Sequence, residues 1–300
     1  MTQQQYSQIE LPDELIGPQL FRFFLAQLFN WSIIVISLLI AGHIDTLWGY
    51  IISAIIIGTR LHAFGLLGHD GAHKLLARNK RLNDALTCMF CMWPAAISLG
   101  QWRRFHFGHH RHHGTPLDPE LMGKQAVAEV WQVPMGKHHI LVTFVKDILC
   151  LGILDALKMK KASYLKHTDR KLNPDDRFGP LAWYGVGTVS LVSFDLAWII
   201  PVWLYALLGP AWAFSRLRLW SEHVGTTGTH RISASWWQRF FFLPHNTWCH
   251  YEHHLHGNIS WSNLPSVRKL YSDVPVIPVS QVFHEFSDQA MDHAPLEKVS

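Results

Sequence analysis

Charged residues and cysteines are both scarce in this 300-residue chain. Asp, Glu, Lys and Arg make up 16% of the residues against 49% hydrophobic ones, and the mean hydropathy is +0.07. This balance is too apolar for an ordinary soluble domain and opposite to that of a disordered chain. The few cysteines stand in apolar or His-rich surroundings and form no short Cys-rich unit, which excludes a secreted disulfide scaffold and favours a reducing environment; they are Cys88, Cys91, Cys150 and Cys249.

Motifs of several other protein classes are also missing. The 26 basic and 22 acidic residues are spread along the chain, so no dense basic face indicates nucleic-acid binding. Residues 1–20 are polar and lack the features of a secretory signal, and we expect no cleaved leader. No internal repeat, Gly-rich phosphate loop or low-complexity stretch divides the chain, which we interpret as a single domain over residues 1–300.

Long hydrophobic runs are present, and they predict membrane spans. A helix needs about 20 apolar residues to cross roughly 30 Å of hydrocarbon. Two hairpins of such runs are candidate transmembrane helices: 23–42 with 47–68, and 181–200 with 202–220. We expect the second hairpin to turn between Pro201 and Pro210. The predicted fold class is therefore an all-α integral membrane protein with about four transmembrane helices.

The remaining segments are too short or too polar to cross. Residues 82–100 are predicted to lie in or dip into the membrane face, and residues 126–158 form an amphipathic interfacial segment. Residues 221–300 are predicted to form a cytoplasmic helical cap. Lys and Arg are absent from the expected outer turns at 43–46 and 201–210, which places both termini on the cytoplasmic side.

Histidine is unusually abundant, with 21 in the chain, and three clusters of it stand out. Residues i, i+3 and i+4 share one face of a helix, so each cluster aims two or three imidazoles at one point, as metal ligands require. The eight histidines at this spacing exceed the six positions of an octahedral centre, which argues for two metal ions. They are His69, His73, His106, His109, His110, His250, His253 and His254.

The clusters can meet only on one side of the membrane. Two predicted crossings precede the first cluster, and two more precede the third. If residues 82–100 do not cross, all three clusters face the cytoplasm, whereas a crossing there would put the second cluster opposite the first.

The residue types do not name the metal, because imidazole suits zinc, copper, iron and nickel alike. The His-Glu-x-x-His motif of zinc proteases is absent. Haem ligation would need single histidines on facing membrane helices rather than dense groups at helix ends. Iron working with oxygen on an apolar substrate is the interpretation that remains.

With their neighbours, the clusters resemble the histidine boxes of the membrane fatty acid desaturase superfamily, the integral-membrane diiron enzymes that include acyl desaturases and related hydroxylases. The resemblance covers roughly Arg60 to Tyr271. Its boxes are matched by LGHDGAH at 67–73, WRRFHFGHHRHHGTPLDPE at 102–120 and NTWCHYEHH at 246–254. It implies that the eight box histidines bind two Fe ions and that O2 is a co-substrate.

The resemblance also assigns roles near the boxes. His223 matches a ninth ligand, and Asn246 matches an asparagine that holds a metal-bound water in several members. His112 and His113 are expected not to bind metal directly, and His245 and His256 receive no role. Carboxylates often orient metal-bound imidazoles by accepting a hydrogen bond from the second ring nitrogen; the candidates are Asp70, Asp118, Glu120, Glu222 and Glu252.

The implied function is oxygen-dependent oxidation of an unactivated C–H bond in a lipid or fatty acyl chain, in the first instance desaturation. A hydroxylase, ketolase or fatty acid decarboxylase on the same scaffold is the alternative, because the outcome depends on where the substrate carbon lies. The chain also reads Leu255-His256 after the third box, where lipid desaturases commonly continue with Phe-Pro. Arg60 and His62, just before the first box, are candidates to line the path to the iron.

Electrons must come from elsewhere, since no haem-binding or flavin domain is present. A separate ferredoxin, rubredoxin or cytochrome b5 type partner is expected, and the basic segment 158–177 is a candidate docking loop. A second alternative, from another class, is a non-catalytic membrane metal-binding or transport protein. A transporter, however, should place ionisable residues near mid-membrane in several spans.

Overall fold

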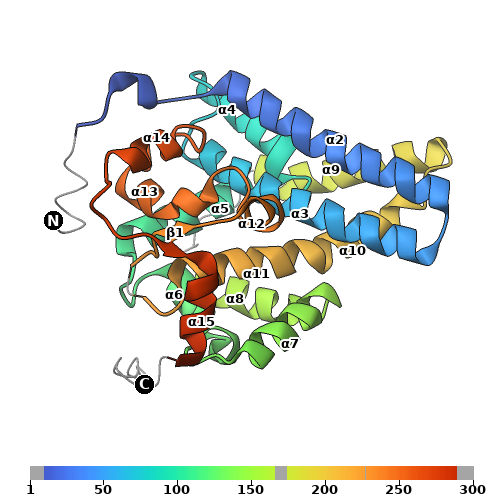
Figure 1. Cartoon of the computed structure of the whole chain (residues 1–300). Coiled ribbons are helices and arrows are strands. Elements are labelled where there is room, and N and C mark those ends of the chain that lie inside the picture. Colours follow the sequence, from blue (N-terminus) through green and yellow to red (C-terminus); the bar gives the residue numbers. More distant parts are fainter. Residues whose placement is uncertain (1–9, 166–173, 227, 289–300) are drawn as a thin grey trace.

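The computed structural model describes residues 10–165, 174–226 and 228–288, and most of these residues are helical (Figure 1). The only strands within them are two-residue segments, β1 (Ile232–Ser233) and β2 (Ile277–Pro278), which pair in parallel with Ile232 opposite Ile277. The predicted all-α class is confirmed. The predicted location of both termini falls outside the described residues.

The first predicted hairpin is present as α2 (Leu20–Ile44) and α3 (Leu47–Ala72). Asp45 adopts a left-handed conformation at the turn, and the Thr46 side chain accepts a hydrogen bond from the Gly49 N–H, which caps α3. Among the described residues, these two helices are long and apolar enough to cross a membrane. Both extend a few residues beyond the predicted spans 23–42 and 47–68.

The predicted boundaries of the second hairpin are wrong. The region forms α9 (Pro174–Ser193), α10 (Ile199–Leu208) and α11 (Pro210–His223), so neither 181–200 nor 202–220 is one continuous helix.

The chain reverses at residues 194–198, before the predicted turn. Pro201 lies in the first turn of α10, where its missing N–H is not needed. The second break falls at Gly209, where an added Cβ would lie only 2.5 Å from the Ile148 carbonyl oxygen. Pro210 has no N–H to continue α10 and disfavours helix at the residue before it, and the close approach of the Ile148 carbonyl requires that this residue be glycine.

The segments between the hairpins form shorter helices. Residues 82–100 contain most of α4 (Lys80–Thr87), a π-helical turn η2 (Cys88–Met92) and an irregular stretch, so no continuous crossing helix forms there. Residues 126–158 contain η3 (Ala128–Val130), α7 (Lys137–Ile148) and the start of α8 (Ile153–Leu165). Leucines on α7 and α8 remain exposed, as expected of an interfacial segment: Leu141, Leu154 and Leu157.

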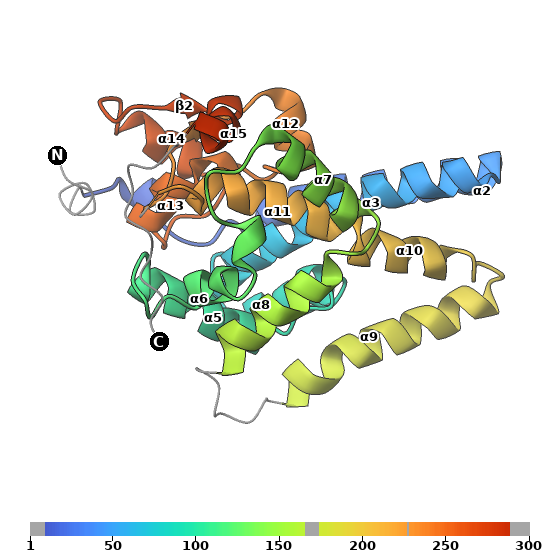
Figure 2. The same ribbon diagram turned by 90° about the horizontal axis from the view of Figure 1, so that it is seen from below.

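The apolar hairpins and the histidine-bearing short helices lie toward opposite ends of the molecule. In both views α2, α3, α9 and α10 extend to one side, and α5, α6, α13 and α14 lie toward the other (Figures 1 and 2). The remaining elements are η1 (Asp13–Leu15), α5 (Leu99–His112), α6 (Pro119–Gln125), α12 (Trp236–Phe241), η4 (Thr247–Cys249), α13 (His250–Leu255), α14 (Leu264–Lys269) and α15 (Val279–Asp288). One apolar core joins α2, α3 and α10, and a second lies between α11 and α15.

Gly58 allows α3 to pack closely against α11. A Cβ added at Gly58 would lie 2.4 Å from the Pro210 Cβ and 2.9 Å from the Ala211 backbone nitrogen. Gly58→Ala is therefore expected to lower the free energy of unfolding by about 1–3 kcal/mol through overpacking. Gly65, in the same helix, has nothing within 4 Å of its Cβ position. Gly65→Ala should be neutral or slightly stabilising, since alanine favours helix by about 1 kcal/mol. Equal thermal unfolding midpoints for the two variants would contradict this packing.

Candidate metal centre

The structure brings all nine predicted ligand histidines into one contiguous cluster, contributed by four helix ends. His69 and His73 lie at the C-terminal end of α3, and His223 is the last residue of α11. The second box lies on the last two turns of α5, and the third box occupies the short helix α13. Residues separated by nearly two hundred positions therefore meet at one place.

Five histidines form a first imidazole pocket, with candidate ligand nitrogens within 4.8 Å of one another: His69, His73, His106, His110 and His253. The Nε2 atoms of His73 and His106 are 2.7 Å apart, and those of His110 and His253 are 3.0 Å apart. The Nε2 atom of His69 is buried without a hydrogen-bond partner. The first pocket thus combines side chains from all three boxes.

A second imidazole pocket lies beside the first. Its candidate nitrogens belong to His109, His113, His223 and His254, which again lie within 4.8 Å of one another. His250 completes the pocket, because its Nε2 atom is 3.0 Å from His223 Nε2 and 3.1 Å from His254 Nε2. The two pockets share a wall formed by adjacent residues of α5 and α13: His109 with His110, and His253 with His254.

The chemistry of these donors fits metal ions. Ligand nitrogens about 2.0–2.1 Å from one ion lie roughly 2.8–4 Å from each other, and the closest nitrogens of the two pockets are 2.7–3.1 Å apart. His109 Nε2, like His69 Nε2, is buried without a hydrogen-bond partner, an arrangement that is costly in water-excluded surroundings. Burial also lowers the pKa of His223, His250 and His254 well below the ordinary value. These imidazoles are therefore neutral at pH 7, with lone pairs available.

Asp118 contacts an imidazole as the sequence predicted for an orienting carboxylate. The Nδ1 atom of His109 lies 2.9 and 3.0 Å from its two carboxylate oxygens. The same carboxylate accepts a 2.8 Å hydrogen bond from the Glu120 N–H, which caps α6. Because Nδ1 is engaged, the free Nε2 of His109 faces the second imidazole pocket.

Glu120 and Glu222 approach the second pocket through ion pairs. Glu120 binds Lys124 at 2.6 Å and lies 3.9 Å from His109 Nε2. Burial opposes the charge of Glu120, but Lys124 and His109 hold its pKa well below the ordinary value. Glu222 pairs with Arg218 at 2.7 Å and lies 3.5 Å from His250 Nε2, and burial raises its pKa to about 7. Glu120 therefore adds negative charge at the edge of the pocket, whereas Glu222 adds charge only when it is ionised.

Asp70 and Glu252 hold backbone and cationic partners instead. Asp70 accepts 2.9 Å hydrogen bonds from the Ser260 hydroxyl and the Trp261 N–H, and its distance of 4.0 Å from His69 Nδ1 is too long for a hydrogen bond. Glu252 forms an ion pair with Arg231 at 2.7 Å. Within the described residues its hydrogen bond and ion pairs are to arginines rather than to a box imidazole, and the orienting role predicted for it stays a prediction.

Asn246 lies in a left-handed conformation before η4, and its side-chain amide donates to the Trp261 carbonyl at 3.1 Å. Its predicted role in holding a metal-bound water stays a prediction. His256 contacts the Tyr271 hydroxyl and lies outside both pockets.

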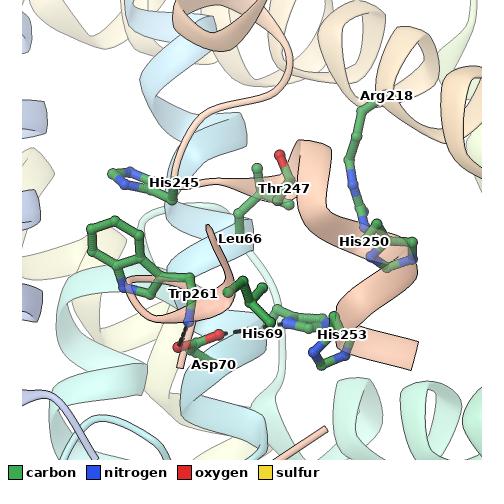
Figure 3. Close-up of a pocket in the computed structure, with 10 residues that line it drawn as sticks. Leu66, His69, Asp70, Arg218, His245, Thr247, His250, His253 and Trp261 are labelled. Carbon is green, nitrogen blue, oxygen red and sulfur yellow. Dashed lines mark hydrogen bonds and ion pairs between the residues drawn. The ribbon is translucent and has the colours of Figure 1, made fainter. Parts of the chain in front are cut away.

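A small cavity lies directly against the first pocket (Figure 3). Its volume is about 20 Å³, room for about one water-sized molecule. His69, His250 and His253 line one side, and Arg218 reaches towards His250 from α11. The cavity as it stands can hold a small molecule beside the imidazoles but not an acyl chain.

His245 lines the same cavity, and a buried network sets its proton position. Arg60, which can only donate, gives a 3.3 Å hydrogen bond to Asn30 Oδ1, so the Asn30 amide nitrogen points to His245 Nε2 at 3.0 Å. His245 Nε2 must therefore accept, and its proton resides on Nδ1. Burial, with Arg60 and His62 nearby, lowers the pKa of His245 to about 3. Arg60 and His62 themselves do not line the cavity, and their predicted place along a path to the metal stays a prediction.

His113 lies closer to the predicted ligands than the sequence interpretation suggested. It was expected to be exposed or to lie next to the ligands without binding metal directly, and its nitrogen lies among those of the second pocket. The helical spacing offered a signal, because His106, His109, His110 and His113 follow i, i+3, i+4 and i+7 on one face. His112 does not share that face and belongs to neither pocket.

Comparisons with known proteins agree with the histidine boxes. The family described as Fatty acid desaturase matches residues 45–278. The sn-1 oleoyl-lipid 12-desaturase of Picosynechococcus sp. is 24% identical over 240 residues, 72% of this chain and 66% of that protein. The dihydrorhizobitoxine desaturase of Bradyrhizobium elkanii is 28% identical over 167 residues, 51% of this chain and 47% of that protein. The match thus spans less than two thirds of each relative. Since the family match includes all three boxes and most of the chain, the protein belongs to the fatty acid desaturase family.

Proposed function

We propose that this protein is a membrane diiron oxidoreductase that uses O2 to oxidise an unactivated C–H bond in a lipid or fatty acyl chain, by desaturation. The observation that carries the proposal is the pair of adjacent imidazole pockets built from all three histidine clusters. When bound, two iron ions would supply the oxygen and electron-transfer chemistry that no side chain provides.

The protein's own residues hold and shield the metal pair. The ring nitrogens of the first pocket come from α3, α5 and α13, so the site requires the assembled fold. Asp118 fixes the ring of His109, and Glu222, when it is ionised, adds charge beside His250. His106, His109, His250 and His253 are buried, which keeps bulk water from the centre and limits side reactions.

The substrate class follows from the family and from the apolar helices. The two relatives are named for different substrates, an oleoyl lipid and dihydrorhizobitoxine, so the family does not narrow the substrate further. The helices α2 and α3 suit a membrane location, where an acyl chain would also reside. The same proposal includes membrane crossing by α9 to α11 and a metal site on the cytoplasmic side. It also includes a separate electron donor of the ferredoxin, rubredoxin or cytochrome b5 type.

The decisive test measures metal and product together. The full chain, purified in detergent and loaded with iron, would be supplied with a reductase, ferredoxin, O2 and a set of acyl lipids. The proposal requires two irons per chain, O2 consumption and a product lighter by two hydrogens in the mass spectrum. A product heavier by one oxygen would identify a hydroxylase, and loss of carbon dioxide a decarboxylase. Variable zinc or copper without O2 consumption would instead support a non-catalytic metal-binding protein.

Asp118→Asn should weaken metal binding without unfolding the chain. Asparagine can still cap α6, but its amide cannot reproduce the paired acceptors that His109 Nδ1 now meets. Changes to such outer partners typically cost about 10–100-fold in metal affinity. Titration of the metal-free protein with Fe(II) under anaerobic conditions would measure this loss. The exposed Asp13, which lies in η1, offers the matched control Asp13→Asn, and equal affinities for the two variants would contradict the role of Asp118.

A further inference from the structure

His113 lies among the predicted ligands at the distances that separate the ligands themselves. Its ring centroid is 4.5 Å from that of His254, 4.8 Å from His109 and 5.0 Å from His223. The ring of His109 lies 5.0 Å from that of His223 and 5.1 Å from that of His254. Geometry alone gives no reason to exclude His113 from the second imidazole pocket.

The backbone after α5 holds His113 in this position. The helix ends at His112, and His113 turns into an extended conformation with φ −46° and ψ 127°. The next residue, Gly114, donates its N–H to Asp118 Oδ2 at 3.3 Å. The carboxylate that orients His109 therefore also anchors the turn that carries His113, and Asp118 sets both rings against the same pocket.

The hydrogen bond between His113 and His223 shares its single proton with a second acceptor. His113 Nε2 lies 3.3 Å from His223 Nδ1, but the Gly228 carbonyl lies slightly closer to that same atom, at 3.2 Å. The carbonyl can take the Nδ1 proton of His223, as expected when His223 binds metal through Nε2. The lone pair of His113 then has no other donor among the described residues and is free for a metal ion.

We propose that His113 is a tenth imidazole of the centre and binds the metal ion held by the second imidazole pocket. The inference rests on the proposed function only in requiring that a metal ion occupies this pocket. It adds a ligand beyond the nine that the resemblance implies.

Cobalt(II) titration of the metal-free full chain in detergent tests this assignment without turnover. The visible absorption of cobalt reports its coordination, and metal analysis gives the number of ions per chain. His113→Ala and His113→Asn are compared with His112→Ala, which removes the neighbouring histidine outside the pockets. Asparagine keeps a hydrogen-bond acceptor for His223 but removes the imidazole. Circular dichroism of each metal-free variant checks that the fold is kept.

The expected result is that the wild type and His112→Ala bind two cobalt ions with the same spectrum. Both His113 variants should weaken one of the two sites by about 100-fold or more, the upper end of the loss seen for outer partners, and change its absorption. Wild-type affinity and absorption in His113→Asn would overturn the assignment, because a hydrogen bond would then suffice. If the wild type itself fails to bind two ions, the proposed function fails first, and the inference falls with it.

Discussion

His253→Ala is expected to abolish turnover and to remove the metal ion of the first imidazole pocket. The His253 ring is 2% exposed, its Nε2 lies 3.0 Å from that of His110, and its centroid lies 4.3 Å from that of His69. The loss should exceed the roughly 10–100-fold effect of changing an outer partner, because a donor atom itself disappears. Product formation and iron per chain, measured on the same preparation, check both parts of the expectation.

The control for this variant is His139→Ala, which removes an exposed histidine on α7. It should keep wild-type iron content and activity. The fold of His253→Ala should be largely retained, as judged by circular dichroism. Retained turnover in His253→Ala, or equal iron contents in the two variants, would contradict the ligand role.

Arg231→Met is expected to produce the largest loss of stability. Arg231 is buried and donates to Glu252 Oε1 at 2.7 Å, to the Tyr271 carbonyl at 2.7 Å and to the Arg268 carbonyl at 2.9 Å. Methionine would leave the fully buried Glu252 carboxylate without its close partner, a change that costs about 3–5 kcal/mol. Glu252 precedes His253 in α13, so the third histidine box should loosen together with the surrounding residues of the predicted helical cap, 221–300.

Denaturant unfolding in detergent measures this loss. The double variant Arg231→Met with Glu252→Met should recover part of the stability, because no buried charge is left unpaired. It should not recover all of it, since three backbone carbonyls lose their donor: those of Tyr271, Val274 and Arg268. Lys269→Met, at an exposed position of α14, should change little. A single variant as stable as Lys269→Met would show that the ion pair is not structural.

The helical spacing of the histidines was sufficient to predict which side chains share a face. His69 and His73, and the i, i+3, i+4 sets of the other boxes, all lie in one cluster, because helical geometry is local. The same rule extended to His113, but the sequence did not show that the turn after α5 is tied to Asp118. The hydrogen bond from the Gly114 N–H to Asp118 keeps the His113 side chain, which lies just beyond the helix end, on the same face as the other histidines of α5.

Two glutamates illustrate what spacing cannot resolve. Glu222 and Glu252 each stand directly before a predicted ligand histidine. Glu222 approaches an imidazole, whereas Glu252 pairs with an arginine. Their local sequences are alike, so the difference arises from what packs against each helix. The same reason explains why position 209 must be glycine, since the end of α7 packs against it.

The amino-acid sequence by itself determined the helical class, the first apolar hairpin and the eight box histidines, since these depend on residue type and local periodicity, while the family and His223 came from the resemblance of the boxes to known ones. Only the tertiary structure decided which imidazoles share a pocket, which carboxylates touch them and where the second hairpin breaks. The physical reason is distance along the chain. The contact between His110 and His253 joins residues 143 positions apart, and partners so remote are chosen by packing rather than by any repeat in the sequence.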